Sequence, residues 1–211
     1  MILLTECVVL AIAGVLIWHA SRVEGWGFVM VFWGGGMAVG LLREWTVVHF
    51  TPLYSYGDFF LQLGGIPLIM AVFWSNFAYV ALRWSENILG SAFITRERTD
   101  EHHPLVFLVM AVISMAVEAY ASQFHMINWE AEPVLTLWGG TPAIVPFGYG
   151  AMGLLFLIAF RAVWRRWQDR LEVALSWLIL LSPVIILVQL GFLLVVKALL
   201  GLLFGSPPEL A

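Results

Sequence analysis

The amino-acid sequence predicts an all-α fold, a polytopic bundle of membrane-spanning helices. Of the 211 residues, 62% are hydrophobic and only 11% are charged, whereas soluble domains carry about 25% charged residues. Several apolar runs reach or approach the roughly 20 residues that cross a bilayer. These observations predict an integral membrane protein in which residues 1–211 form a single transmembrane domain.

Charged or turn-rich stretches divide the chain into six expected spans, at about 2–20, 26–46, 65–84, 104–123, 141–163 and 172–196. The first span lacks the basic start and the cleavage site of a signal peptide, so we expect it to be retained. The triplet Gly34–Gly36 predicts close helix packing, and Pro183 is expected to kink the last span. Residues 197–211 begin at Lys197, which is expected to snorkel to the interface. This tail is expected to lie in the interface or to return as a seventh span.

The basic residues predict the orientation of the helices. Eight of the ten Lys and Arg residues lie in the loops 21–25, 83–103 and 161–170. The positive-inside rule places these loops in the cytoplasm and the N-terminus outside the cell membrane. The long loops 47–64 and 124–140 then lie outside. So few basic residues do not favour nucleic-acid binding, and the single cysteine excludes an intramolecular disulfide.

The sequence also predicts an internal repeat, with copies at 26–84 and 104–163. When Glu44 is aligned with Glu118, the GGIP at 64–67 falls opposite the GGTP at 139–142. Each copy reads as a helix, a loop and a returning helix, with both loops on one face. Such parallel repeats frame central sites in transporters and membrane enzymes. The alternative is a chance likeness, because proline is common in the first turn of a helix.

Glu44 and Glu118 are the acids expected at membrane depth, where an ionisable residue is by default a functional-site hypothesis. Burial and a neighbouring like charge favour the neutral form of a carboxylic acid, so each is expected to act as a proton donor. The alternative is that both lie solvated at the headgroup level. Asp58 and Glu130, one in each outer loop, are expected to serve as a second acid or in ion pairs, or else to be solvated.

A metal site is the next possibility, because His49 and His125 occupy similar places in the two copies. Glu118 and His125 are seven residues apart, whereas metal sites in helix bundles usually show pairs three or four residues apart. The sequence therefore favours no metal and no cofactor. It does not exclude a metal held by Glu44, His49, Glu118 and His125.

Aromatic residues gather around the two outer loops, where they are expected to line a pocket for a long apolar substrate. They include Trp45, Tyr54, Tyr56, Trp129 and Tyr149, and His49 and His125 are expected beside them. Aromatic faces can stabilise a carbocation. Part of this set is also expected from the ordinary aromatic belt of membrane proteins.

The stretch REWTVVHFTPLYSYGDFFLQLGGIPLIMAVFWSNFAYVAL, at 43–82, resembles the first half of the membrane carotenoid hydratase family, the bisanhydrobacterioruberin hydratase-like proteins. The residues that carry the resemblance are Glu44, Tyr54, Tyr56, Gly65, Pro67, Leu68, Trp74 and Tyr79. The second half is similar in outline through Trp129, Glu130, Gly140 and Pro142. It carries Glu118 where the family has an Asp-rich start, and the chain is shorter than typical members. The resemblance covers roughly 35–165.

The resemblance implies hydration of a terminal C=C of a long isoprenoid, with Trp74 among the substrate-binding residues. An acid protonates the alkene, a tertiary cation forms, and water adds. The expected partners are a long apolar isoprenoid or lipid substrate and membrane lipids; the oligomeric state is left open. The same acid chemistry fits a membrane-integral terpene cyclase. Further alternatives are a non-enzymatic lipid- or pigment-binding protein or complex subunit, a transporter, and, from the string GDFFL, a lysoplasmalogenase-like hydrolase.

Overall fold

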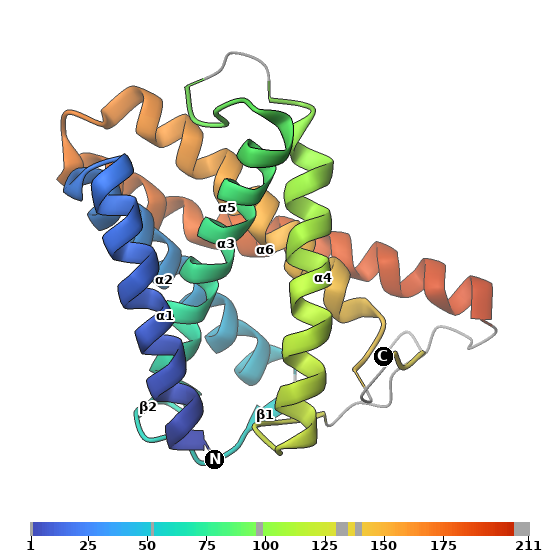
Figure 1. Cartoon of the computed structure of the whole chain (residues 1–211). Coiled ribbons are helices and arrows are strands. Elements are labelled where there is room, and N and C mark those ends of the chain that lie inside the picture. The colour runs from blue at the N-terminus through green and yellow to red at the C-terminus, as the bar shows by residue number, and fades with distance from the viewer. Residues whose placement is uncertain (1, 52, 96–98, 130–134, 138–140, 205–211) are drawn as a thin grey trace.

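The helices form one bundle in the computed structural model, which describes residues 2–51, 53–95, 99–129, 135–137 and 141–204 (Figure 1). These residues form six helices: α1 (Ile2–Val23), α2 (Trp26–Phe50), α3 (Leu68–Leu89), α4 (His102–Gln123), α5 (Ile144–Trp167) and α6 (Leu171–Phe204). They also form four short strands: β1 (Tyr54–Tyr56), β2 (Gln62–Leu63), β3 (Ile66–Pro67) and β4 (Ile127–Trp129). The predicted all-α helix bundle is confirmed.

Among the described residues, five helices are long and apolar enough to cross a membrane: α1, α2, α4, α5 and α6. They support an integral membrane protein. The remaining helix, α3, is less apolar because it carries Ser75, Asn76 and Arg83, and its role as a sixth span stays a prediction. Because α3 packs against α1, α2, α4 and α5, its polar residues can be buried in protein. Asn76 is buried and accepts a hydrogen bond from Trp33 Nε1 at 3.1 Å.

The last helix, α6, continues through Pro183 and Lys197 to Phe204 as one element of 34 residues. The helix therefore continues past residue 196, where the sixth span was expected to end, and the limits of that span in the membrane stay a prediction. Residues 205–211 lie outside the described residues. In Figure 1, α6 runs at a steep angle to α1 and α4, and its C-terminal part extends beyond α4 on the right.

Glycines in α2 let α3 approach closely. A Cβ atom at Gly36 would lie 2.6 Å from Ser75 Oγ, and one at Gly40 would lie 2.9 Å from the Trp74 side chain. Both distances are too short for ordinary contacts, so only glycine fits without movement of the neighbour. The close packing expected at Gly34–Gly36 is confirmed, and Gly40 extends it by one turn.

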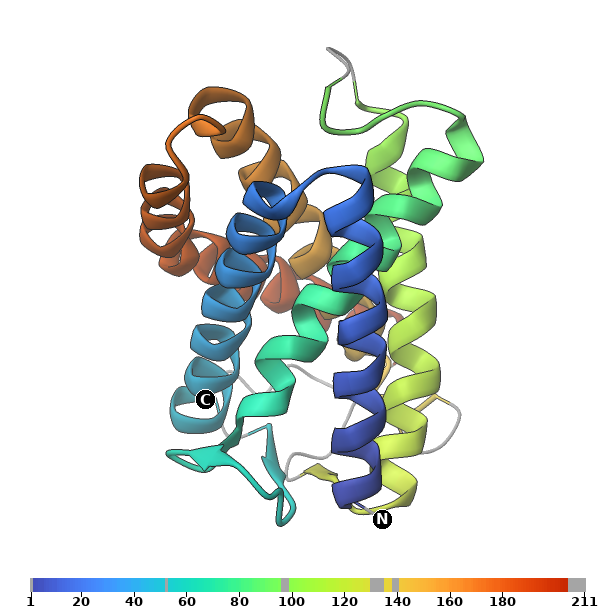
Figure 2. The same cartoon turned by 60° about the vertical axis from the view of Figure 1, so that its left-hand side comes forward.

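The two long loops meet at the lower end of the bundle in Figure 1, which we call the loop end. Strand β1 comes from the loop after α2, and β4 comes from the loop after α4. They pair in antiparallel fashion, with Tyr54 opposite Trp129 and Tyr56 opposite Ile127. Figure 2 shows the same end from another side, below α2 and α3 and to the left of the lower ends of α1 and α4. The pairing joins segments that are more than 70 residues apart in the sequence.

The Gly64–Gly65 pair forms the turn of a small hairpin, in which Gln62 of β2 pairs with Pro67 of β3. The φ angles of the two glycines are 58° and 79°, in the left-handed region that favours glycine. The second loop also reverses direction before α5, as shown by the antiparallel bridge between Thr136 and Pro142. Gly139 and Gly140 lie outside the described residues, and the internal repeat stays a prediction.

Candidate active site: two buried carboxylates with different surroundings

Glu44 of α2 and Glu118 of α4 are both buried, with exposed fractions of 0% and 3%. One stacked aromatic pair lies between their hydrogen-bond networks. The rings of Trp74 and Tyr149 are 4.5 Å apart between centroids, at an interplanar angle of 27°. Trp74 donates to one carboxylate and Tyr149 donates to the other. The two acids therefore belong to one connected site.

Both oxygens of Glu44 are fully occupied by donors. Oε1 accepts from Arg43 Nη1 at 2.6 Å and from Trp74 Nε1 at 2.7 Å. Oε2 accepts from the hydroxyl of Tyr54 at 2.6 Å and from that of Tyr56. Hydrogen bonds of this charge-assisted kind are the strong ones in proteins. The hydrogen bonding of this carboxylate is therefore complete, with one guanidinium among its four donors.

Arg43 is the cation of this group, and the sequence analysis assigned it no role in the site. Its side chain is buried, its Nη1 also donates to the Tyr54 hydroxyl, and its guanidinium lies over the ring of Trp74, 5.2 Å from the centroid. A buried ion pair is stable only when its geometry is good and the remaining polar atoms are satisfied. The aromatic donors around Glu44 meet that need on the carboxylate side.

Tyr54 and Tyr56 reach Glu44 from β1, outside the membrane-spanning helices. Burial is the main cause that raises the pKa of both phenols above the ordinary value of about 10; the Glu44 charge raises it further, and the Arg43 charge lowers it. Both hydroxyls therefore keep their protons at neutral pH and remain donors to Glu44.

Glu118 is bonded on one side only. Its Oε1 accepts from the Tyr149 hydroxyl at 2.5 Å. Within the described part of the chain, the buried Oε2 has no hydrogen-bond partner. Leaving a buried polar atom unpaired costs free energy, commonly about 1–3 kcal/mol. This carboxyl group is therefore the member of the site that has an oxygen available to a ligand or to a proton.

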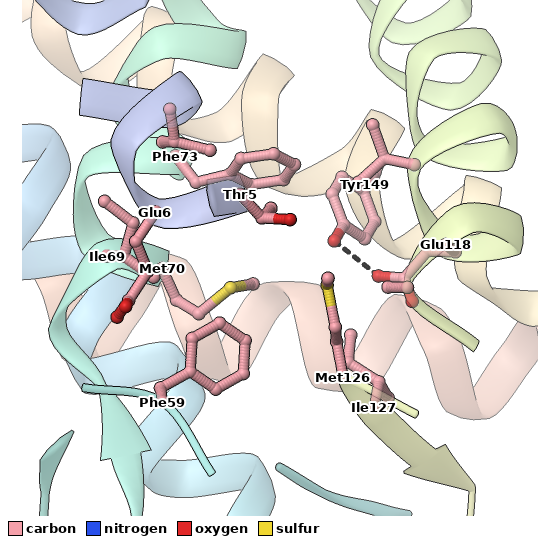
Figure 3. Close-up of a pocket in the computed structure, with 13 residues that line it drawn as sticks. Thr5, Glu6, Phe59, Ile69, Met70, Phe73, Glu118, Met126, Ile127 and Tyr149 are labelled. Carbon is pink, nitrogen blue, oxygen red and sulfur yellow. Dashed lines mark hydrogen bonds between the residues drawn. The ribbon is translucent and has the colours of Figure 1, made fainter. Parts of the chain in front are cut away.

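Glu118 and Tyr149 line an apolar cavity of about 50 Å³, larger than the roughly 10–15 Å³ that one water molecule requires. Figure 3 shows the two side chains facing each other on one side of the cavity. Residues of α1, including Glu6, and of α4 also line it. Apolar side chains from α3 and the two loops form the remaining walls: Phe59, Ile69, Met70, Phe73, Met126 and Ile127. An acid beside an apolar void is the arrangement that proton transfer to an apolar ligand requires.

Glu6 of α1 is a third buried carboxylate, which the sequence analysis missed. Its two oxygens accept from the backbone N–H of Phe60 at 3.2 and 3.4 Å. In Figure 3, the Glu6 carboxylate points away from Glu118. Glu6 thus ties α1 to the loop that supplies Phe59. An acid inside the apolar run of the first span is itself a signal that could have identified it.

Several predicted substrate-binding residues lie away from the cavity. Trp45 and His49 stack on each other at 5.2 Å, and both are exposed. His125 is exposed in a turn, with a positive φ of 53°. Asp58, which was expected to be a second acid, to join an ion pair or to be solvated, is exposed as well. The structure therefore does not bring these four residues to the lining of the cavity.

The remaining predicted residues divide between the two acids. Tyr54, Tyr56 and Trp74 surround Glu44, and Tyr149 binds Glu118, as described above. Trp129 is partly buried; its Nε1 donates to Ser122 Oγ at 3.0 Å, and its ring packs against Tyr54. Glu130 lies outside the described residues.

The described side chains offer no site that fits a metal ion: no group of three or more His, Cys, Asp and Glu residues lies close enough together. His49 bonds the carbonyl of Trp45 at 3.0 Å and faces outward, so it does not join Glu44 and Glu118. What the arrangement supports is acid–base chemistry by a carboxyl group.

No protein-family model, curated protein sequence or solved structure matches this chain.

Proposed function

We propose that the protein is a membrane enzyme that hydrates a terminal C=C of a long isoprenoid, such as an acyclic carotenoid, with Glu118 as the acid. One observation carries the proposal: Glu118 is a buried carboxyl group in the lining of a largely apolar cavity, and one of its oxygens has no partner among the described residues. Glu44 is less suited to proton donation, because four donors already occupy its oxygens.

The proposed reaction needs only Glu118 and water. The carboxyl group gives its proton to the less substituted alkene carbon, and the π electrons form the new C–H bond. A tertiary carbocation and the Glu118 carboxylate result. The oxygen of a water molecule then bonds to the cation, and its surplus proton returns to Glu118. The product is a tertiary alcohol, and the acid is regenerated. General acid–base catalysis of this kind typically contributes about 10²–10⁴-fold in rate.

The walls of the cavity suit the intermediate of this reaction. The rings of Phe59, Phe73 and Tyr149 line it, and aromatic faces attract a cation by about 0.5–2 kcal/mol. The carboxylate that remains after proton transfer has the opposite charge to the carbocation. Apart from Thr5, Glu6, Glu118 and the Tyr149 hydroxyl, the lining is apolar, which limits the water beside the cation and matches a hydrocarbon substrate.

The lining of the cavity includes residues of α1 and α4, the two helices between which we propose that a substrate dissolved in the bilayer enters. Thr5 and Val9 of α1 and Val117 of α4 line the cavity, and Thr5 Oγ1 and Tyr120 OH bridge these two helices at 3.3 Å. We propose that the hydrocarbon chain enters between α1 and α4. In the proposed orientation in the cell membrane, the loop end faces outward and the basic loops face the cytoplasm.

Expression in a host that makes acyclic carotenoids, followed by mass analysis of the pigments, tests the proposal. The expected product is heavier than its precursor by one water molecule. Glu118→Gln should remove at least about 99% of the conversion while leaving the protein folded. Glu172→Gln is the matched control, because Glu172 is exposed on α6; its conversion should equal that of the wild type.

Other results would contradict hydration in distinct ways. A product of unchanged mass and altered absorption would indicate cyclisation or isomerisation by the same acid. A bound but chemically unaltered pigment in the wild type would indicate a binding protein. Full conversion by Glu118→Gln would exclude Glu118 as the acid.

A further inference from the structure

The side chains of Trp74 and Tyr149 connect two of the buried acids, Glu44 and Glu118. Trp74 Nε1 donates to Glu44 Oε1 at 2.7 Å. The Trp74 ring stacks on Tyr149 at 4.5 Å, and the Tyr149 hydroxyl donates to Glu118 Oε1 at 2.5 Å. The order of contacts is therefore Glu44, Trp74, Tyr149, Glu118, with residues from α2, α3, α5 and α4 in turn.

The plane of Trp74 is set from the side of Glu44. The indole N–H lies in the plane of the ring, so its hydrogen bond to Glu44 Oε1 restricts the orientation of the ring. The Arg43 guanidinium lies over the ring at 5.2 Å. Gly40 removes the Cβ atom that would otherwise lie 2.9 Å from the Trp74 side chain. Three groups of α2 thus orient one ring of α3.

The orientation of Tyr149 in turn decides how Glu118 is held. Its ring is 2% exposed and lies flat against Trp74. Its hydroxyl binds Oε1 and leaves Oε2 without a partner among the described residues. A tilt of the phenol would loosen or misdirect this hydrogen bond, and misplacement of a catalytic group by about 1 Å can cost up to roughly 10²-fold in rate.

We infer that Glu44 and Trp74 are positioning residues that act on Glu118 through Tyr149, and that Glu44 is not itself the proton donor. The inference rests on the proposed function for its catalytic readout. It also gives the buried Arg43–Glu44 pair a use beyond stability, since a buried ion pair by itself is weak evidence for stabilisation.

A double-mutant cycle tests the inference on activity. Trp74→Phe keeps an aromatic ring but removes the N–H, and should lower kcat by roughly 10-fold or more with KM unchanged. If Trp74 acts through Tyr149, the double variant Trp74→Phe/Tyr149→Phe should be no slower than Tyr149→Phe alone. Losses that multiply in the double variant would overturn the inference.

Trp33→Phe is the matched control for Trp74→Phe. Trp33 is equally buried and also donates its Nε1 across a helix interface, to Asn76 Oδ1 at 3.1 Å. Among the described residues, its side chain makes no hydrogen bond or ring contact with Tyr149 or Glu118. Its kcat should stay within about twofold of the wild type, because its loss costs packing and one hydrogen bond but leaves Tyr149 in place. An equal loss in both variants would mean a general packing effect.

Glu44→Gln covers the case in which Trp74→Phe does not fold. The glutamine keeps a carbonyl oxygen for the Trp74 N–H but cannot donate a carboxylic proton. In the folded fraction of Glu44→Gln, kcat should stay within about tenfold of the wild type, whereas Glu118→Gln loses at least about 10²-fold. Equal losses in the two variants would make Glu44 an acid and overturn the inference.

Infrared spectroscopy separates this inference from the proposed function, because it needs no turnover. The C=O stretching band that disappears in Glu118→Gln belongs to the protonated Glu118 carboxyl group, and its frequency reports the hydrogen bond from Tyr149. The band should shift in Tyr149→Phe and Trp74→Phe but not in Trp33→Phe. A shifted band in a protein without hydratase activity would keep the inference and overturn the proposed function. An unshifted band in Trp74→Phe would overturn the inference.

Discussion

The α2–loop–α3 and α4–loop–α5 units each bury one glutamate near the loop end, yet only the first unit completes the hydrogen bonding of its carboxylate. Among the residues that the structure describes, Glu44 accepts from four donors, whereas Glu118 accepts from one. The difference can be followed residue by residue. A glutamate is buried near the loop end in both units, but Glu44 is held by a complete set of hydrogen bonds, whereas Glu118 keeps an oxygen that can take part in chemistry.

The paired strands supply one part of the difference. In β1, Tyr54 and Tyr56 both direct hydroxyls to Glu44. In β4, the residues opposite them are Trp129 and Ile127. Ile127 has no donor in its side chain, and Trp129 donates to Ser122. The second strand therefore gives Glu118 no hydrogen bond and presents Ile127 to the cavity.

The residue before each acid supplies the other part. Arg43 precedes Glu44 and pairs with it at 2.6 Å. Val117 precedes Glu118 and lines the cavity. Where the first unit holds a guanidinium, the second has an apolar wall. The cavity thus lies beside Glu118, the acid that is not preceded by a cationic residue.

The largest expected contrast is in stability. Glu44→Ala leaves the Arg43 guanidinium buried without its carboxylate, which should lower the free energy of unfolding by about 3–5 kcal/mol. Glu118→Ala removes a carboxyl group that has one hydrogen bond, and the loss should be about 0.5–1.5 kcal/mol. Chemical denaturation in detergent micelles, followed by tryptophan fluorescence, measures both. Equal losses would mean that the two acids are structurally equivalent.

The contrast can be broken by giving the second unit a cation. Val117→Arg places a guanidinium beside Glu118, as Arg43 lies beside Glu44, and holds Glu118 as an ionised partner. Conversion of the carotenoid should fall by about 10²-fold or more, because the acid no longer carries a proton. Val117→Met adds bulk without charge and is the control. If the two variants lose the same activity, filling of the cavity rather than charge is the cause.

Removal of one donor from each acid sharpens the contrast further. Tyr56→Phe takes one hydrogen bond from the Glu44 carboxylate and should destabilise the fold by about 1.5–3 kcal/mol, the range for bonds to charged groups, with activity of the folded protein retained. Tyr149→Phe should instead lower kcat, because it removes the donor that holds Glu118. Thermal unfolding measures the expected loss of stability in Tyr56→Phe, and pigment conversion measures the expected loss of activity in Tyr149→Phe. The comparison fails if Tyr56→Phe loses more activity than Tyr149→Phe.

A smaller effect is expected at Gly40, where α3 approaches the first unit. Gly40→Ala puts a methyl group 2.9 Å from the Trp74 side chain, and the overpacking should cost about 1–3 kcal/mol. Gly14→Ala on α1 meets nothing within 4 Å, so there the better helix propensity of alanine should leave stability unchanged or raise it by up to about 1 kcal/mol. The melting temperature should fall in Gly40→Ala and should stay the same or rise in Gly14→Ala.

The smallest effect concerns the phenols of the first unit at high pH. Because the folded-state pKa values of Tyr54 and Tyr56 are raised, their stabilising effect is complete below the unfolded pKa of about 10 and is lost as the pH rises through the folded values. The phenolate absorbance of the wild type, compared with Tyr54→Phe/Tyr56→Phe, should show no ionisation of these two groups near pH 10. Ionisation there would mean that the pocket around Glu44 is open to water.

The class of the protein and two of its three buried acids could be read from the amino-acid sequence. Long apolar runs predict membrane helices, because a bilayer admits few polar side chains, and five such helices are present among the described residues. Glu44 and Glu118 stood out because each follows an apolar stretch, and both prove to be buried. Gly34–Gly36 predicted close helix packing because glycine has no side chain to keep a neighbouring helix away.

Only the tertiary structure decided what surrounds each acid. The donors to Glu44 include Tyr54, Tyr56 and Trp74, which are 10, 12 and 30 residues away, and the donor to Glu118 is Tyr149, 31 residues away. Hydrophobic patterning sets the depth of a residue in the bundle, but hydrogen bonds of a few ångströms depend on how helices and loops pack. The sequence therefore could not tell a satisfied carboxylate from one that faces a cavity, since that difference arises between elements rather than within them.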